Sequence, residues 1–173
     1  TLDLNLREAI QNLESAPQVP GRLEAVGGRQ INYRVFVDYA HTDDALDNSL
    51  KAVRELKPRR LITVFGCGGD RDKSKRPIMA RVADQCSDLA ILTTDNPRTE
   101  DPAAIIADAQ AGFQSARYAV IEDRREAIAE AIKVAGERDV VVIAGKGHET
   151  YQEVDGVRHP FDDREVAKQC IAA

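Results

Sequence analysis

Tryptophan is absent from this sequence of 173 residues, and aromatic residues make up only 5% of it. The chain therefore lacks the aromatic platforms on which single-stranded nucleic acids stack. Positive charge is not in excess either, because the formal net charge is −5 and the acidic Asp72 interrupts the basic run at 71–76. No apolar run approaches the roughly 20 residues that span a bilayer. These absences predict that neither nucleic acid nor membrane is a partner.

Cysteine is scarce as well. The three cysteines, Cys67, Cys86 and Cys170, are widely spaced and form no C-x-x-C pair for zinc or redox chemistry. No metal site is predicted, and a reducing cytoplasm is the expected location because no basic, leucine-rich leader opens the chain. Cys67 lies in a glycine-rich loop without a histidine nearby in sequence, which favours a structural role over a reactive one.

The first residues differ in character from the rest. Asn5 and Glu8 form a capping-box pattern that predicts a helix, and prolines end it at 17 and 20. The apolar face of this helix has little of its own to pack on. The sequence also begins at Thr1 without an initiator methionine, which predicts either a processed chain or a piece of a longer protein.

Short apolar runs then alternate with helix-like segments. Because these runs are continuous, a parallel sheet buried on both faces is expected. An Asp-Gly pair at 155–156 predicts a hairpin, and a final helix follows from about 162. The predicted fold class is α/β, a doubly wound, mostly parallel Rossmann-like sheet with a C-terminal β-hairpin and helix. Strands are predicted at 33–37, 61–65, 89–92, 119–121 and 140–144, with helices at 44–56, from 77, at 102–113 and at 125–135.

Three polar loops follow predicted strands. They are 66–72 (Gly-Cys-Gly-Gly-Asp-Arg-Asp), 95–98 (Asp-Asn-Pro-Arg) and 145–149 (Gly-Lys-Gly-His-Glu). In an open α/β sheet, ligands bind beyond the carboxyl ends of the strands, so we expect the three loops to form one site.

The charges of these loops indicate the ligand. Arg71, Arg98 and Lys146 can bind carboxylate or phosphate, whereas Asp95 and Glu149 can bind an ammonium group. An apolar ligand would leave these charges unpaired. The sequence therefore predicts a zwitterionic ligand beside a phosphorylated one.

None of the loops matches a nucleotide-binding or zinc motif. Arg71 stands where G-x-G-x-x-G requires glycine, no P-loop occurs in the chain, and no second histidine completes H-E-x-x-H. Each loop also has a plainer interpretation, as a tight turn at 66–69, an Asx-type turn capping the next helix at 95–98, or a solvated turn at 145–149. His41 similarly either contacts a ligand or caps the following helix, and 20–24 is interpreted as a linker turn.

Taken in order, these strings resemble the C-terminal domain of the Mur ligases. Asp-Asn-Pro-Arg at 95–98 marks the members of that family that add meso-diaminopimelate, and lysine-adding members differ there. One departure is Asp43, where the family usually has proline, and this change is expected to loosen the loop after His41. The resemblance rests on 20–24 (Pro-Gly-Arg-Leu-Glu), 38–42 (Asp-Tyr-Ala-His-Thr), 65–72, 75–77 (Lys-Arg-Pro), 95–98, 145–149 and 151–152 (Tyr-Gln).

The resemblance implies two parts: residues 1–19 as the last helix and linker of a central ATPase domain, and 20–173 as the C-terminal amino-acid-binding domain. Full-length members add an N-terminal domain for the UDP moiety. Their central domain supplies the P-loop, the Mg²⁺ ligands and a carbamylated lysine, none of which occurs here. ATP and Mg²⁺ are thus implied for the whole enzyme, with meso-diaminopimelate and UDP-MurNAc-L-Ala-D-Glu as the other small-molecule partners.

The implied reaction is ATP-dependent amide formation in peptidoglycan precursor synthesis, through an acyl phosphate that the amine of diaminopimelate attacks. No catalytic residue is expected within this chain beyond support from Arg22 and His41, and the isolated chain is expected to fold without turnover. Diaminopimelate would contact Arg71, Asp95, Asn96, Pro97, Arg98, Gly145 and Glu149, and ATP would contact Arg22, Asp38, His41 and Lys146.

Two other functions stay open. A lysine-adding or folylpolyglutamate-type sibling ligase would share the fold but not residues 95–98. A stand-alone, non-catalytic amino-acid-binding module would explain the missing P-loop. The intact mass of the protein from its native source would distinguish a fragment from a module.

Overall fold

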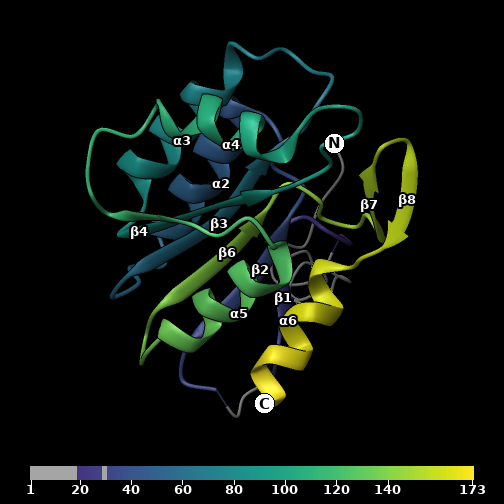
Figure 1. Ribbon diagram of the computed structural model, residues 1–173. Coiled ribbons are helices and arrows are strands. Elements are labelled where there is room, and N and C mark those ends of the chain that lie inside the picture. The colour runs from purple at the N-terminus through teal and green to yellow at the C-terminus, as the bar shows by residue number, and fades with distance from the viewer. Residues whose placement is uncertain (1–18, 29–30) are drawn as a thin grey trace, which may run out of the picture.

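The computed structural model describes residues 19–28 and 31–173. Its described strands form a six-stranded sheet in the order β1-β2-β6-β3-β4-β5, shown in Figure 1. All neighbouring strands are parallel except β1, which pairs antiparallel with β2. The strands are β1 (Glu24–Val26), β2 (Arg34–Asp38), β3 (Leu61–Cys67), β4 (Leu89–Thr94), β5 (Tyr118–Val120) and β6 (Val140–Ala144).

Helices cover both faces of the sheet (Figure 1). One layer contains α2 (Asp43–Arg54), α3 (Lys75–Cys86) and α4 (Pro102–Gln110), and the other contains α5 (Arg124–Val134) and α6 (Asp163–Ala172). A separate hairpin of β7 (Tyr151–Val154) and β8 (Val157–Pro160) precedes α6. The predicted doubly wound α/β fold with a C-terminal hairpin and helix is confirmed.

The two faces of each central strand carry two different cores. Successive side chains of a strand point to opposite faces, so Leu61 and Phe65 of β3 pack under α2, α3 and α4. Ile62 and Val64 of the same strand pack under α5 and α6. Every residue of β3 and β6 is buried, which is why these strands are continuous apolar runs in the sequence.

The structure corrects the prediction in several places. The turn predicted at 20–24 is present at 20–23, but Glu24 begins the edge strand β1, which was not predicted and is too short to show a periodic pattern. Two helix ends differ from the predicted ones by a few residues. The helix predicted from 77 (α3) begins at Lys75, and the helix predicted to end at 113 (α4) ends at Gln110. The helix predicted from Asn5 lies outside the described residues, and the boundary between 1–19 and 20–173 stays a prediction.

The parallel strands β2, β3, β4 and β6 all end at one edge of the sheet, so the loops that follow them meet there. None of the described helices is both long and apolar enough to cross a membrane.

Candidate functional site

The predicted loops gather around one cavity of about 100 Å³ at the carboxyl edge of the sheet. All three loops contribute to its wall, together with the loop after β2. Of the residues predicted to contact diaminopimelate, every one except Pro97 lines it. The lining residues are Tyr39, His41, Gly66, Gly68, Arg71, Asp95, Asn96, Arg98, Gly145 and Glu149.

Glycines let these loops approach one another closely. A Cβ atom at Gly69 would overlap the carbonyl of Pro97, and the amide of Gly69 donates to Asn96 O at 2.9 Å. Gly145 has a φ of +121°, and a Cβ atom there would overlap the Asp95 carboxylate. Close packing between loops thus explains the glycines that the sequence left open between anion binding and tight turns.

Asn96 joins two of the loops. Its Oδ1 accepts from Lys146 Nζ at 2.7 Å and from the amide of Glu153 at 3.0 Å. Its Nδ2 donates to Glu149 Oε2 at 3.0 Å. The side chain of Lys146 is fully buried, and its pKa is lowered because burial disfavours the charged form. The sequence-predicted contact of Lys146 with ATP stays a prediction, and its observed neighbours are the groups that line the cavity.

Arg98 is held by the hairpin β7–β8 as well as by Pro97. The amide of Arg98 donates to Glu153 O at 3.0 Å, and its carbonyl accepts from the amide of Asp155 at 2.6 Å. Its Nη1 donates to Gly69 O at 2.6 Å. Within the described chain, neither Arg98 nor the exposed Arg71 forms an ion pair with a carboxylate, so both guanidinium groups are available to an anionic ligand.

The stretch after Arg98 fastens the loop after β4 to the loop after β3. Thr99 Oγ1 donates to Asp70 Oδ1 at 2.8 Å. Glu100 accepts from the amide of Asp70 at 2.6 Å and from the buried Arg76 at 2.7 Å. The hydrogen bond from Arg76 is the main reason that the pKa of Glu100 falls to about 2.

The alternative interpretation, in which His41 or the loop at 95–98 caps the helix that follows it, is wrong. The N-cap of α2 is Thr42 and not His41, and the N-cap of α4 is Asp101. Asp43, expected to loosen the loop after His41, begins α2 and pairs with Lys75 of α3 at 3.1 Å. That pair links the start of α2 to α3.

A second group of predicted residues lies beside the cavity. Arg22 stands 5.2 Å from the ring centre of Tyr39, whose ring lies 4.5 Å from that of His41 and 5.1 Å from that of His148. Tyr39 and His148 were not predicted as site residues. The signal in the sequence that could have identified them is that both are aromatic residues close to a predicted ATP contact.

Asp38, also predicted to contact ATP, is largely engaged within the protein. Its Oδ2 accepts from the amide of Leu23 at 2.7 Å, and its Oδ1 accepts from Ser49 Oγ at 2.9 Å. Leu23 has a φ of +40°, so Asp38 stabilises a strained turn that carries Arg22 toward Tyr39.

Sequence reasoning missed a buried ion pair beneath the cavity. Arg124 Nε and Nη2 donate to the two carboxylate oxygens of Asp163 at 2.8 Å each, and both side chains are fully buried. Arg124 Nη2 also donates to Ala144 O at 3.0 Å, where β6 ends. The available signal was an arginine in the first turn of a helix, where the helix dipole disfavours a cation.

Cys67 is expected to resist alkylation. It is buried against Met79, and burial raises the pKa of its thiol to about 12. At pH 8 the thiolate is then about a thousandfold scarcer than for a thiol at its ordinary pKa of 9.0. Iodoacetamide labelling followed by peptide mapping should show Cys67 protected in the native chain and labelled in urea. Labelling of native Cys67 as fast as Cys170 would contradict this structural role.

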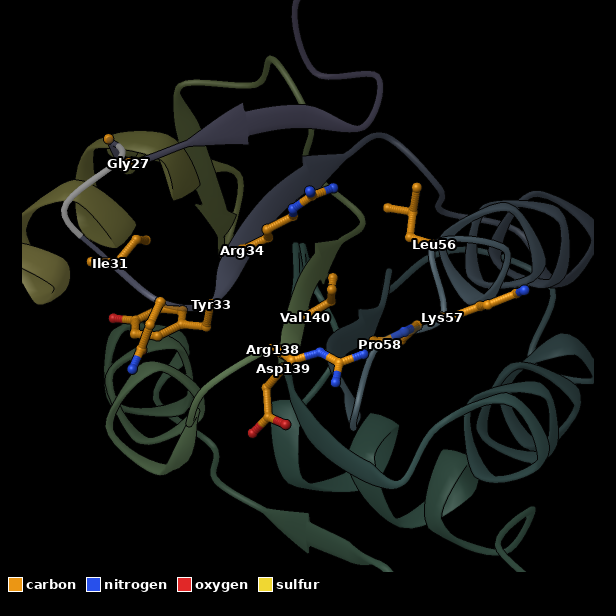
Figure 2. A pocket seen from close by; sticks show the side chains of 12 residues that line it. Gly27, Ile31, Tyr33, Arg34, Leu56, Lys57, Pro58, Arg138, Asp139 and Val140 are labelled. Atoms are coloured by element: carbon orange, nitrogen blue, oxygen red, sulfur yellow. The ribbon is translucent and has the colours of Figure 1, made fainter.

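A larger cavity, of about 550 Å³, lies at the opposite edge of the sheet. Figure 2 shows Arg34, Lys57 and Arg138 at its wall, from three separate segments. It is next to the starts of β2 and β6, whereas ligands of open α/β sheets bind at the carboxyl ends. Its acidic residue, Asp139, is already paired with Arg60 at 2.6 Å. We therefore place the site in the smaller cavity.

Comparison with known proteins identifies the family of the chain. The family described as Mur ligase, glutamate ligase domain, matches residues 21–147. The chain is 51% identical over 167 residues to the UDP-N-acetylmuramoyl-L-alanyl-D-glutamate–2,6-diaminopimelate ligase of Clostridium botulinum, covering 96% of this chain and 35% of that protein. It is 55% identical over 169 residues to the ligase of the same name from Syntrophomonas wolfei, covering 96% and 34%.

Solved structures give the same picture. A structure of a UDP-N-acetylmuramoyl-L-alanyl-D-glutamate–2,6-diaminopimelate ligase superposes with a TM-score of 0.82 at 45% identity, over 98% of this chain and 35% of that one. A folylpolyglutamate synthase/dihydrofolate synthase from Yersinia pestis superposes with a TM-score of 0.60 at 19% identity, over 82% and 32%, a likeness of fold alone. The chain thus spans about a third of the length of the curated relatives it matches.

Proposed function

The chain belongs to the Mur ligase family, and from that premise we propose that it is the amino-acid-binding part of an ATP-dependent ligase. The proposed ligase adds meso-diaminopimelate to UDP-MurNAc-L-Ala-D-Glu during peptidoglycan precursor synthesis in the cytoplasm. Residues 20–173 are the C-terminal domain in this proposal, and 1–19 end a central ATPase domain. The relatives named UDP-N-acetylmuramoyl-L-alanyl-D-glutamate–2,6-diaminopimelate ligase support this proposal, because they are about half identical to the chain over nearly its whole length.

The charge pattern of the cavity is the observation that carries the proposal. Arg71 and Arg98 line it without carboxylate partners among the described residues, and the carboxylates of Glu149 and Asp95 line it as well. Meso-diaminopimelate carries two carboxylates and two ammonium groups, so it can pair with both kinds of side chain. Lysine lacks the distal carboxylate and would leave one guanidinium unpaired.

The domain contributes binding and orientation to the reaction. Arg71 and Arg98 would hold carboxylates, and Glu149, steadied by Asn96, would hold an ammonium group. The attacking amine is then fixed in place, which replaces an encounter in solution by a reaction between bound groups. Arg22 and His41, beside Tyr39, would face ATP. Asp38 would bind the ribose only after losing one of its present hydrogen bonds.

Magnesium is assigned to other parts of the full-length ligase. No group of three or more His, Cys, Asp or Glu side chains that could hold a metal ion occurs in the part of the chain that the structure describes. The P-loop and the Mg²⁺ ligands would lie in the central domain, so no step of the reaction is assigned to a metal on this chain.

Steady-state kinetics of the full-length protein test the proposal. With UDP-MurNAc-L-Ala-D-Glu and ATP, phosphate release should depend on meso-diaminopimelate and be much weaker with lysine or glutamate. The 173-residue chain alone should show no turnover, because it has no P-loop. A preference for lysine or glutamate would favour a sibling ligase. Turnover by the isolated chain would overturn the proposal that it is a domain of a longer enzyme.

A further inference from the structure

Lys146 is a buried cation, and the polar side chains nearest its ammonium line the cavity. Its ammonium lies 2.7 Å from Asn96 Oδ1, 3.6 Å from Glu149 Oε2 and 3.7 Å from Asp95 Oδ1. Its side chain has no exposed surface. Its Nζ also lies over the ring of Tyr151, 5.8 Å from the ring centre. The ammonium group of Lys146 therefore contacts side chains that form the wall of the cavity and is not exposed to solvent.

The surroundings of Asn96 determine which way its amide faces. Lys146 Nζ and the amide of Glu153 can only donate, so both require the oxygen of Asn96. The Asn96 nitrogen is thereby directed to Glu149, to which it donates at 3.0 Å. Without Lys146, one of the two donors that specify this orientation is gone.

Apart from the guanidinium groups of Arg71 and Arg98 at the cavity wall, the charged side chains around Lys146 do not balance. Arg124 is paired with Asp163 through two hydrogen bonds. Lys146 remains as the cation between Asp95 and Glu149, so this group carries one negative charge in excess. An incoming ammonium group can supply the missing positive charge. The pKa of Lys146 is lowered, chiefly because burial disfavours the charged form, while Asp95 and Glu149 act in the opposite direction.

We propose that Lys146 is a positioning residue for the amino-acid substrate, which fixes the Asn96 carboxamide and the Glu149 carboxylate at the cavity wall and does not contact the nucleotide. This role replaces the phosphate contact that the sequence predicts. It rests on the proposed function, because the substrate it positions is the amino acid of the proposed ligase.

A double-mutant cycle in the full-length ligase tests this role. Lys146→Met keeps an unbranched side chain, one atom shorter, and removes the charge. It should raise KM for meso-diaminopimelate about tenfold or more while KM for ATP stays within about twofold. Asn96→Ala should also raise KM for diaminopimelate. In the double variant, the combined rise should fall short of the product of the two single rises by about fivefold or more, because the residues act as a unit.

Lys133→Met is the matched control. Lys133 is 77% exposed on α5, and its ammonium pairs with Glu130 at 3.2 Å. Its replacement should leave both KM values unchanged. Independent, multiplicative effects of Lys146→Met and Asn96→Ala would overturn the proposal. So would a rise in KM for ATP with KM for diaminopimelate unchanged.

A crystal structure of the wild-type ligase with diaminopimelate and a non-hydrolysable ATP analogue decides the matter even where the variants fail to fold. Lys146 Nζ should remain bonded to Asn96 and make no hydrogen bond to phosphate. A direct bond to phosphate would overturn the proposal. If the wild-type enzyme uses a different amino acid, the proposed function fails, and the same cycle run with that amino acid still tests the role of Lys146.

Discussion

Replacing Arg98 by alanine in the full-length ligase is expected to lower kcat/KM for meso-diaminopimelate about 30- to several-thousand-fold. Arg98 lines the cavity, makes no ion pair within the described chain, and is held in place by its bond to Gly69 O at 2.6 Å. Its removal would leave the distal carboxylate of the substrate desolvated and unpaired, at a cost of about 2–5 kcal/mol. Each 1.4 kcal/mol corresponds to about tenfold, which gives this range.

Backbone strain does not account for such a loss. Arg98 has a φ of +53°, and alanine and arginine both carry a Cβ atom, so the variant keeps the same conformational cost. Arg98→Lys should recover only part of the efficiency, because an ammonium cannot reproduce the two-pronged guanidinium contact.

Lysine as the substrate provides the internal control. It has no distal carboxylate, so Arg98→Ala should change its kcat/KM far less and narrow the preference between the two amino acids. Arg81→Ala, at an exposed arginine on α3, should change neither. An unchanged kcat/KM for diaminopimelate, or an equal loss for both amino acids, would show that Arg98 does not bind the distal carboxylate.

The parts of the structure that could be predicted are those that local patterns encode. Residues 61–65 and 140–144 are continuous apolar runs because β3 and β6 lie in the middle of the sheet, buried on both faces. The ends of such strands are visible as changes to glycine and charge, and parallel strands bring those ends together. The gathering of Arg71, Arg98 and Glu149 around one cavity was predictable for this reason.

The parts that could not be predicted depend on tertiary contacts. A lysine between two glycines looks the same in sequence whether it faces solvent or the interior. Gly145 and Gly147 have φ values of +121° and +54°, and the turn they allow directs Lys146 inward. The pairing of Arg124 with Asp163 likewise depends on α5 and α6 packing side by side, which no local pattern specifies.

That buried pair underlies the second large effect. Burial alone would lower the pKa of Arg124, but the charge and hydrogen bonds of Asp163 outweigh it and raise the pKa above its ordinary value. Both ions have lost their hydration, so each depends on the other. Through Ala144 O, Arg124 also holds the end of β6, immediately before the loop that carries Lys146 and Glu149.

Asp163→Ala is therefore expected to lower the free energy of unfolding of the 173-residue chain by about 3–5 kcal/mol, because it leaves the guanidinium buried without its counter-ion. Urea unfolding measures this, with Glu165→Ala as the control. Glu165 also lies in the first turn of α6, but its pair with Lys168 is exposed and should contribute only about 0–1 kcal/mol. Combining Arg124→Met with Asp163→Leu should recover at least half of the loss, since removing both charges removes the unpaired ion. If Asp163→Ala lowered the free energy of unfolding no more than Glu165→Ala, the ion pair of Arg124 and Asp163 would not stabilise the packing of α5, α6 and the end of β6.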